Sequence, residues 1–206
     1  MKIRWVPAYN APVVLTFAVL ALAVHGIDVM SGGSIVPAYF AVLPHFDWRS
    51  PLSWFRLVSH VLGHKDTTHL VTNFSMILLI GPILEEKYGG RVLLIMIAIT
   101  ALATGVLNTL FFSTGLMGAS GIVFMMILLG SFANHTPGKI PVTFLLVLGL
   151  YLTGEATSIF HHDGISHFAH LFGGLFGTVF GFWLGGKGGG KSKSNPVSKA
   201  KSKSKD

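Results

Sequence analysis

The chain has 206 residues, of which 51% are hydrophobic and only 11% are charged. Soluble domains carry about a quarter charged residues, so this composition excludes an ordinary soluble domain and indicates a surface that faces lipid. Cysteine is absent, which excludes a disulfide framework, a zinc–thiolate site and a thiol nucleophile, and the formal charge of +7 does not indicate nucleic acid, because seven of the fifteen basic residues lie beyond Trp183.

Apolar segments divide the chain at lengths that suit a bilayer, since a spanning helix needs roughly 20 mostly apolar residues. Six segments are candidates: residues 12–30, 68–84, 91–112, 118–133, 140–160 and 167–184. No clear small-residue cleavage site follows the first, so we interpret it as a span and not as a cleavable signal peptide. Residues 31–67 form an insertion rich in Pro, Trp and Phe, which is typical of a structure lying in the membrane interface. The predicted fold is therefore an all-α membrane protein, a six-transmembrane-helix bundle with a long interfacial loop between helices 1 and 2.

The placement of basic residues predicts the orientation of these spans. Twelve of them fall on one side, and Arg49, Arg56 and Lys65 fall on the other. The positive-inside rule therefore places both termini in the cytoplasm and the insertion outside, which agrees with an even number of spans. We expect a multi-pass protein of a prokaryotic cell (inner) membrane, with residues 1–184 as the membrane domain. Residues 185–206 are Lys-, Ser- and Gly-rich and are predicted to be a disordered cytoplasmic tail, which either contacts anionic lipid head groups or fixes the orientation of the last helix.

Polar residues inside apolar spans are costly and suggest function, and the first such pair along the chain is His69 and Asn73. Their i, i+4 spacing puts both on one helix face, so a His donor and an Asn amide can aim at one point. Stabilising a developing oxyanion needs fixed donors of this kind. The alternative is that both side chains bond to neighbouring backbone carbonyls.

The fourth segment opens with Gly118, Ala119, Ser120 and Gly121. Because it is short for a span, we expect its helix to begin near Gly118 or Ser120, below the outer surface. Irregular backbone at that depth is tolerated only where it is buried in protein or lines a wet cavity. The glycines leave Ser120 open to a substrate backbone, and the helix start adds its positive dipole end. The alternative is ordinary packing of small residues, with the Ser hydroxyl bonded to its own helix.

The last segment carries His170 one turn before a stripe of small residues formed by Gly173, Gly177 and Gly181. Such a stripe lets another helix approach to backbone contact. If that helix is the fourth segment, His170 meets Ser120 and can act as the base that a serine nucleophile needs. A structural His bonded to a carbonyl is the alternative.

No carboxylate is obviously placed to orient His170. Asp163 is a predicted loop residue, and Glu155 has no clear geometric link to the site. The sequence therefore favours a Ser–His dyad over a triad.

In their order along the chain, these motifs resemble those of the rhomboid family of intramembrane serine proteases. The matching residues are 55–60 (FRLVSH), His64, 69–73 (HLVTN), Glu85 with Gly89, 118–121 (GASG) and 169–173 (AHLFG). A GxSG motif alone is common. Preceded by HxxxN and followed by AHxxG, on the second, fourth and sixth segments, it is specific.

The resemblance implies a six-helix core whose active site lies in a water-filled cavity open to the outside. It implies Ser120 as nucleophile, His170 as general base, and an oxyanion hole formed by the side chains of His69 and Asn73 with the Ser120 N–H. Its substrates would be single-pass membrane proteins, cut near the outer face. Arg56 and Glu85 would hold the insertion and the second loop in shape, and His60 and His64 would support the polar network. The full set of supporting positions is Gly118, Gly121, Phe124, Arg56, His60, His64, Glu85 and Gly173.

Two positions depart from the family pattern. Phe55 stands where the family usually has Trp, and Phe124 stands where many members have a Tyr on which the catalytic His stacks. The aromatic face remains at Phe124, but the hydroxyl does not. Neither departure removes a catalytic group.

Two other functions are compatible with parts of this pattern. A non-catalytic rhomboid-like binder of membrane proteins would be signalled by loss of Ser120 or His170, and both are present. A His-lined metal transporter is suggested by seven histidines on the predicted outer side, but there is no HExxH helix and no His-plus-carboxylate cluster in the spans. We therefore expect no metal, no cofactor and no nucleic-acid partner. The expected partners are single-pass substrates and the lipid bilayer.

Overall fold

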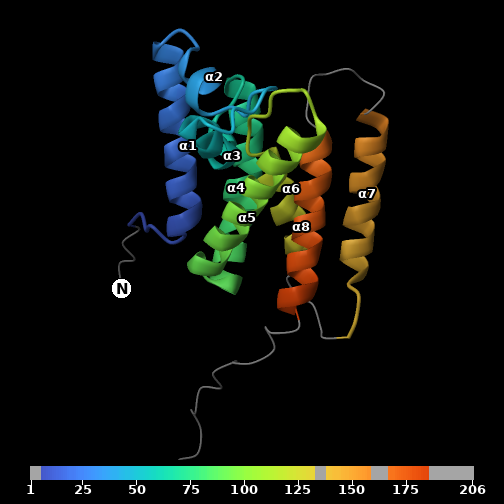
Figure 1. Cartoon of the computed structure of the whole chain (residues 1–206). Helices are drawn as coiled ribbons and strands as arrows, with labels where there is room; N and C mark the ends of the chain where they lie inside the picture. Colours follow the sequence, from blue (N-terminus) through green and yellow to red (C-terminus); the bar gives the residue numbers. More distant parts are fainter. Residues whose placement is uncertain (1–5, 133–137, 159–166, 186–206) are drawn as a thin grey trace, which may run out of the picture.

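The computed structural model describes residues 6–132, 138–158 and 167–185, which form helices joined by short connections (Figure 1). These helices are α1 (Pro12–Met30), α2 (Ile35–Tyr39), α3 (Pro51–Ser59), the 3-10 helix η1 (His60–Leu62), α4 (Thr67–Tyr88), α5 (Gly90–Phe111), α6 (Ser120–Gly130), α7 (Val142–Ser158) and α8 (His167–Gly185). Within the described ranges, β pairing is limited to one isolated bridge between Val42 and Leu116.

Four of these helices, α1, α4, α5 and α8, are long and apolar enough to cross a membrane. The two other predicted spans are shorter apolar helices: α6 has 11 residues and α7 has 17. The chain is thus an all-helical membrane protein, and the count of six spans stays a prediction. The predicted tail, apart from residue 185, lies outside the described residues.

The insertion between α1 and α4 folds into the short helices α2, α3 and η1. Arg56 on α3 donates from its guanidinium to the carbonyl of Ala38 at the end of α2. The indole of Trp54 donates to the Trp48 carbonyl at 3.2 Å, and their rings lie 5.7 Å apart, edge to face. Both indoles are at least half exposed, which suits a segment in the membrane interface.

Helix α4 begins where Asp66 accepts a hydrogen bond from the His69 N–H at 2.8 Å, a standard N-cap. The helix continues past Pro82 to Tyr88, four residues beyond its predicted end. The extension carries Glu85, whose two carboxylate oxygens accept the N–H groups of Val13 and Val14, each at 3.0 Å. Glu85 therefore caps the first turn of α1 and ties α4 to it.

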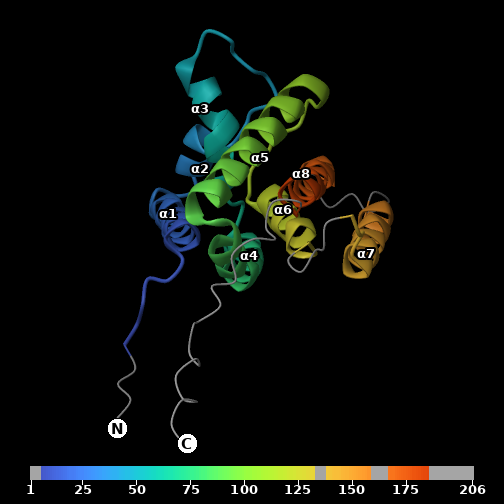
Figure 2. The same ribbon diagram turned by 90° about the horizontal axis from the view of Figure 1, so that it is seen from below.

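Helices α6 and α8 pack backbone against backbone, and Figure 2 shows them side by side with α7 beyond them. A Cβ on Gly173 would lie 2.1 Å from the carbonyl oxygen of Gly121, and one on Gly177 would lie 2.2 Å from that of Met125. Only glycine fits at these distances. The glycine stripe of the last helix thus packs on the helix that begins at Ser120, which is the arrangement needed to bring His170 toward Ser120.

Candidate active site

The loop before α6 is held in place by the insertion between α1 and α4. Leu116 pairs with Val42 through two backbone hydrogen bonds of 2.9 and 3.0 Å. The Gly118 N–H donates to the carbonyl of His60 at 2.9 Å, and Gly118 has φ +113°, a conformation that favours glycine. The insertion therefore fixes the backbone immediately before Ser120.

His64 makes a further link to this loop. Its Nε2 accepts a hydrogen bond from the Ala119 N–H at 3.4 Å, and its Nδ1 lies 3.3 Å from the Leu62 carbonyl. An accepting Nε2 requires the neutral ring with its proton on Nδ1. Burial, and next the charge of His69, lowers the pKa of His64 to about 4. The ring is thus neutral at pH 7, in the form that the Ala119 contact needs.

His60, like His64, is a buried and neutral ring. Its Nδ1 lies 3.1 Å from the Leu57 carbonyl, and its Nε2 faces the Thr104 hydroxyl at 3.5 Å. Burial lowers the pKa of His60 to about 4, so this ring is also neutral near pH 7. His60 and His64 are thus positioned as structural groups behind the loop.

His69 and Asn73 converge on the same loop from α4. A Cβ on Gly118 would lie 2.6 Å from Cε1 of His69 and 3.7 Å from Nδ2 of Asn73. The Asn73 Nδ2 atom is buried and has no hydrogen-bond partner among the described residues. Leaving a buried donor unpaired costs about 1–3 kcal/mol, so this amide is a donor held ready for an acceptor that enters the site.

Ser120 is the first residue of α6, with Ala119 as its N-cap. The first N–H groups of a helix have no partner within it, and the positive end of the helix dipole lies there. The Ser120 residue is partly exposed. Ser120 thus follows by two residues the position, Gly118, that His69 and Asn73 approach.

His170 reaches this point from α8. Its ring stacks on Phe124 with centroids 4.5 Å apart and planes tilted by 41°. Phe124 lies one helical turn after Ser120 on the same face of α6. His170 also interacts electrostatically with His69. Three helices thus bring together the candidate nucleophile, base and oxyanion donors that the sequence singled out.

Other predicted residues lie elsewhere. Glu85 is sixteen residues after His69 on α4, about 24 Å along the helix, so it supports α1 and not the catalytic groups. Asp163, His161 and His162 lie outside the described residues, as does the side chain of Glu155. In the described part of the chain, no three His, Asp or Glu side chains are grouped to hold a metal ion.

Tyr151 on α7 is a neighbour of the site that the sequence did not indicate. Its ring packs on Phe124 at 4.8 Å, so Phe124 contacts both Tyr151 and His170. One Tyr within an apolar segment gives no pattern by which this contact could be foreseen.

Comparison with known families finds one match. The family model described as the Rhomboid domain matches residues 51–187, which is more than half of the chain and runs from α3 through α8. No curated protein matches the chain. The family match includes all four of the converging residues.

Proposed function

The chain belongs to the rhomboid family, and we propose that it is an intramembrane serine endopeptidase that cleaves membrane-protein substrates near their outer ends. One observation carries the proposal: His69 and Asn73 of α4 and His170 of α8 converge on the loop and first turn that contain Ser120. Family membership suggests the reaction class. The convergence of these residues supports the proposal that this chain has kept the proteolytic activity.

In the proposed reaction, the Ser120 Oγ attacks the carbonyl carbon of the scissile peptide bond while His170 takes the hydroxyl proton. The tetrahedral intermediate then collapses as His170 returns the proton to the leaving nitrogen, which yields an acyl-enzyme. Water, deprotonated by His170, hydrolyses the acyl-enzyme and restores Ser120. The contact of its ring with Phe124 helps to orient the base.

The negative oxygen of the intermediate is proposed to bind the Ser120 N–H, the Asn73 amide and the His69 imidazole. The unpaired Nδ2 atom of Asn73 supports this role, because it gains its first partner only when an acceptor enters. One preorganised donor of this kind lowers the barrier by about 3–4 kcal/mol. Neutral His60 and His64 contribute indirectly by holding the loop.

The depth of the site suits a substrate helix that unwinds near one membrane face. Helix α6 has 11 residues, about 16 Å in length, roughly half of a 30 Å hydrocarbon core. Ser120 at its start is thus proposed to lie below the membrane surface, with water reaching it from one side. The distribution of basic residues supports the outside as that side.

The proposal is tested with purified protein in liposomes and a labelled single-span substrate whose outer helical turn contains Ala, Gly or Pro. Wild type, Ser120→Ala and His170→Ala are compared in the presence of EDTA. We expect cleavage by wild type alone. Equal cleavage by all three would show that neither residue is needed and would contradict the dyad.

If neither wild type nor the variants cleave the substrate, each protein is treated with a fluorophosphonate, a reagent that reacts with activated serines. Labelling that requires both Ser120 and His170 would identify an active enzyme with another substrate preference. Absence of labelling would favour a non-catalytic rhomboid-like protein that binds membrane clients.

A further inference from the structure

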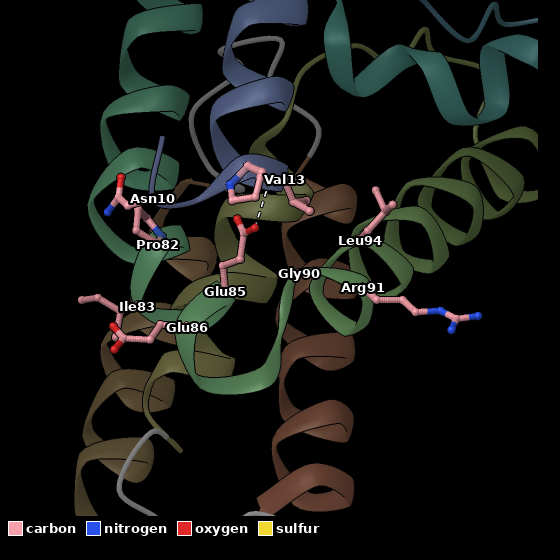
Figure 3. Close-up of a pocket in the computed structure, with 10 residues that line it drawn as sticks. Asn10, Val13, Pro82, Ile83, Glu85, Glu86, Gly90, Arg91 and Leu94 are labelled. Carbon is pink, nitrogen blue, oxygen red and sulfur yellow. Dashed lines mark hydrogen bonds between the residues drawn. The ribbon is translucent and has the colours of Figure 1, made fainter. Parts of the chain in front are cut away.

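Helix α1 packs antiparallel against α4, although the family match begins only at residue 51 and does not include α1. Where α1 starts, α4 is near its end. There the Glu85 carboxylate accepts the N–H groups of Val13 and Val14, and Figure 3 shows it directed at Val13. A Cβ on Gly81 would lie 2.8 Å from Cγ2 of Val14, so the two helices are close at this level.

Further along, the contact between the two helices is aromatic. The rings of Phe17 on α1 and Phe74 on α4 lie 5.1 Å apart, edge to face. Phe74 also contacts the ring of His64 at 5.7 Å. Because Phe74 directly follows Asn73, α1 packs on α4 at the level of a proposed oxyanion donor.

His25, near the end of α1, meets the first turn of α4. Its Nε2 lies 3.0 Å from Oγ1 of Thr67, the first residue of α4. Its Nδ1 is buried and has no hydrogen-bond partner among the described residues. An orphaned N–H is rarer in protein interiors than an orphaned acceptor, so we assign the ring proton to Nε2. His25 therefore donates to the Thr67 hydroxyl.

The last turns of α1 are themselves fixed. Asp28 is only 8% exposed, and its Oδ1 accepts the Val36 N–H of α2 at 2.8 Å. Asp28 lies three residues after His25, on nearly the same face of α1. His25 is thus a donor on a helix that is tied both to the insertion and to α4.

Thr67 and His69 lie on nearly opposite sides of α4, because residues two positions apart are about 200° apart around a helix. On its own side, His69 approaches Gly118 and contacts the ring of His64 at 5.1 Å. The bond from His25 therefore supports this turn of α4 from behind His69, and it limits how far His69 can recede from the loop before Ser120.

We propose that His25 is a positioning residue for the oxyanion site: its hydrogen bond to Thr67 holds the first turn of α4, and with it the imidazole of His69. The inference rests on the proposed proteolytic function, in which His69 donates to the oxyanion. Because that bond forms only in the transition state, losing its support should lower kcat and leave KM nearly unchanged.

The experiment is a double-mutant cycle in the liposome cleavage assay. His25→Phe keeps an aromatic ring but cannot donate, and Thr67→Val removes the acceptor. We expect each to lower kcat about five- to tenfold with KM within about twofold, as the loss of one hydrogen bond would give. The double variant should be no slower than either single one, because both break the same bond.

Three matched variants accompany the cycle. His25→Gln can donate from a similar position and should recover most of the rate. Ile27→Phe, at a 54% exposed position of α1, and Thr68→Val, at an exposed position of α4, should behave as wild type. Wild-type kcat in His25→Phe, or losses that multiply in the double variant, would overturn the proposal.

A second measurement does not depend on activity. Amide hydrogen exchange, followed by mass spectrometry, should be faster in the first turn of α4 in His25→Phe and Thr67→Val. It should stay at the wild-type rate in His25→Gln and, in every variant, at the start of α5. If wild type neither cleaves nor reacts with a fluorophosphonate, the proposed function fails, and the exchange result alone decides whether His25 orders this turn. Unchanged exchange in His25→Phe would then overturn the inference.

Discussion

Helix α8 contacts α6 and α7 in different ways. Against α6 it places glycines directly on backbone, with a Cβ on Gly173 or Gly177 falling within 2.2 Å of a carbonyl oxygen. Against α7 it places Gly174, where a Cβ would lie 2.9 Å from a ring atom of Tyr151. The first contact fixes helix positions to a fraction of an ångström, whereas the second depends on a side chain that has rotamers.

Helices α7 and α6 also differ in how much of their surface is buried. Leu146 and Leu150 are 63% and 76% exposed, and Gly149 has open space around it. Helix α6, between α4 and α8, is buried along most of its length. The catalytic geometry is therefore concentrated where backbones touch, and α7 contributes to it through the ring of Tyr151. Substitutions at α4, α6 and α8 should be severe, and matched ones on α7 should be mild.

Among substitutions that leave Ser120 and His170 in place, the largest effect is expected for Asn73→Ala, which removes a proposed oxyanion donor. We expect kcat to fall by about 10²–10³ with little change in unfolding temperature, because the deleted Nδ2 has no hydrogen-bond partner among the described residues. Thr72→Ala, at the exposed neighbouring position on α4, is the control and should retain activity. Similar losses in both variants would mean that α4 is sensitive in general and that Asn73 is not a specific donor.

The next largest effect is expected for Gly173→Ala, which forces α8 away from α6. Overpacking of this kind costs about 1–3 kcal/mol of stability, and a shift of about 1 Å in a catalytic group lowers rates about 100-fold. Gly149→Ala, on the open face of α7, should leave both properties near wild type. Equal tolerance at the two positions, measured by substrate cleavage and thermal unfolding, would contradict the contrast between the two contacts.

Acidification should weaken the insertion between α1 and α4 before the rest of the molecule. His60 and His64 have a folded pKa of about 4 and an ordinary value of 6.5. Above pH 6.5 both states are neutral. As the pH falls from 6.5 toward 4, the unfolded state takes up protons that the folded state refuses, so the free energy of unfolding decreases.

By pH 5.5 this loss should be about 1 kcal/mol for each histidine. It is measured as the decrease in unfolding temperature between pH 7.5 and 5.5. His64→Gln should have a shallower pH dependence than wild type, whatever its stability at pH 7.5. An unchanged slope would show that His64 is not buried in its neutral form.

The smallest effect is expected at Tyr151, whose ring packs on Phe124 from α7. Tyr151→Leu removes a ring contact worth about 0.5–1.5 kcal/mol, so cleavage should slow only a few-fold. Leu150→Ala, beside it on the lipid-facing surface, should have no effect on cleavage. A loss at Tyr151 as large as that at Asn73 would place α7 within the catalytic geometry and break the comparison.

Sequence reasoning located the helices and catalytic candidates because both depend on local patterns. The i, i+4 spacing of His69 and Asn73 put them on one face, and the helix of the fourth segment begins at Ser120, within the predicted range. The stripe at Gly173, Gly177 and Gly181 indicated a close helix contact, and the structure identifies α6 as the partner.

The contacts that the sequence did not predict join residues far apart along the chain. Glu85 caps α1 across 71 to 72 positions, and nothing near Glu85 indicates that partner. The pairing of Val42 with Leu116 likewise joins two irregular segments without strand periodicity. The predicted end of the second span at residue 84 was too early, because the polar residues after Pro82 continue the helix to Tyr88.

The central claim is that Ser120 is a nucleophile activated by His170. The most direct measurement is mass-spectrometric identification of the residue that a fluorophosphonate labels in membranes containing wild type, His170→Ala or Ser75→Ala, the last removing an exposed serine whose hydroxyl bonds to the Val71 carbonyl. We predict modification of Ser120 in wild type and in Ser75→Ala, and none in His170→Ala. Labelling at another residue, or labelling of Ser120 that persists without His170, would contradict the account.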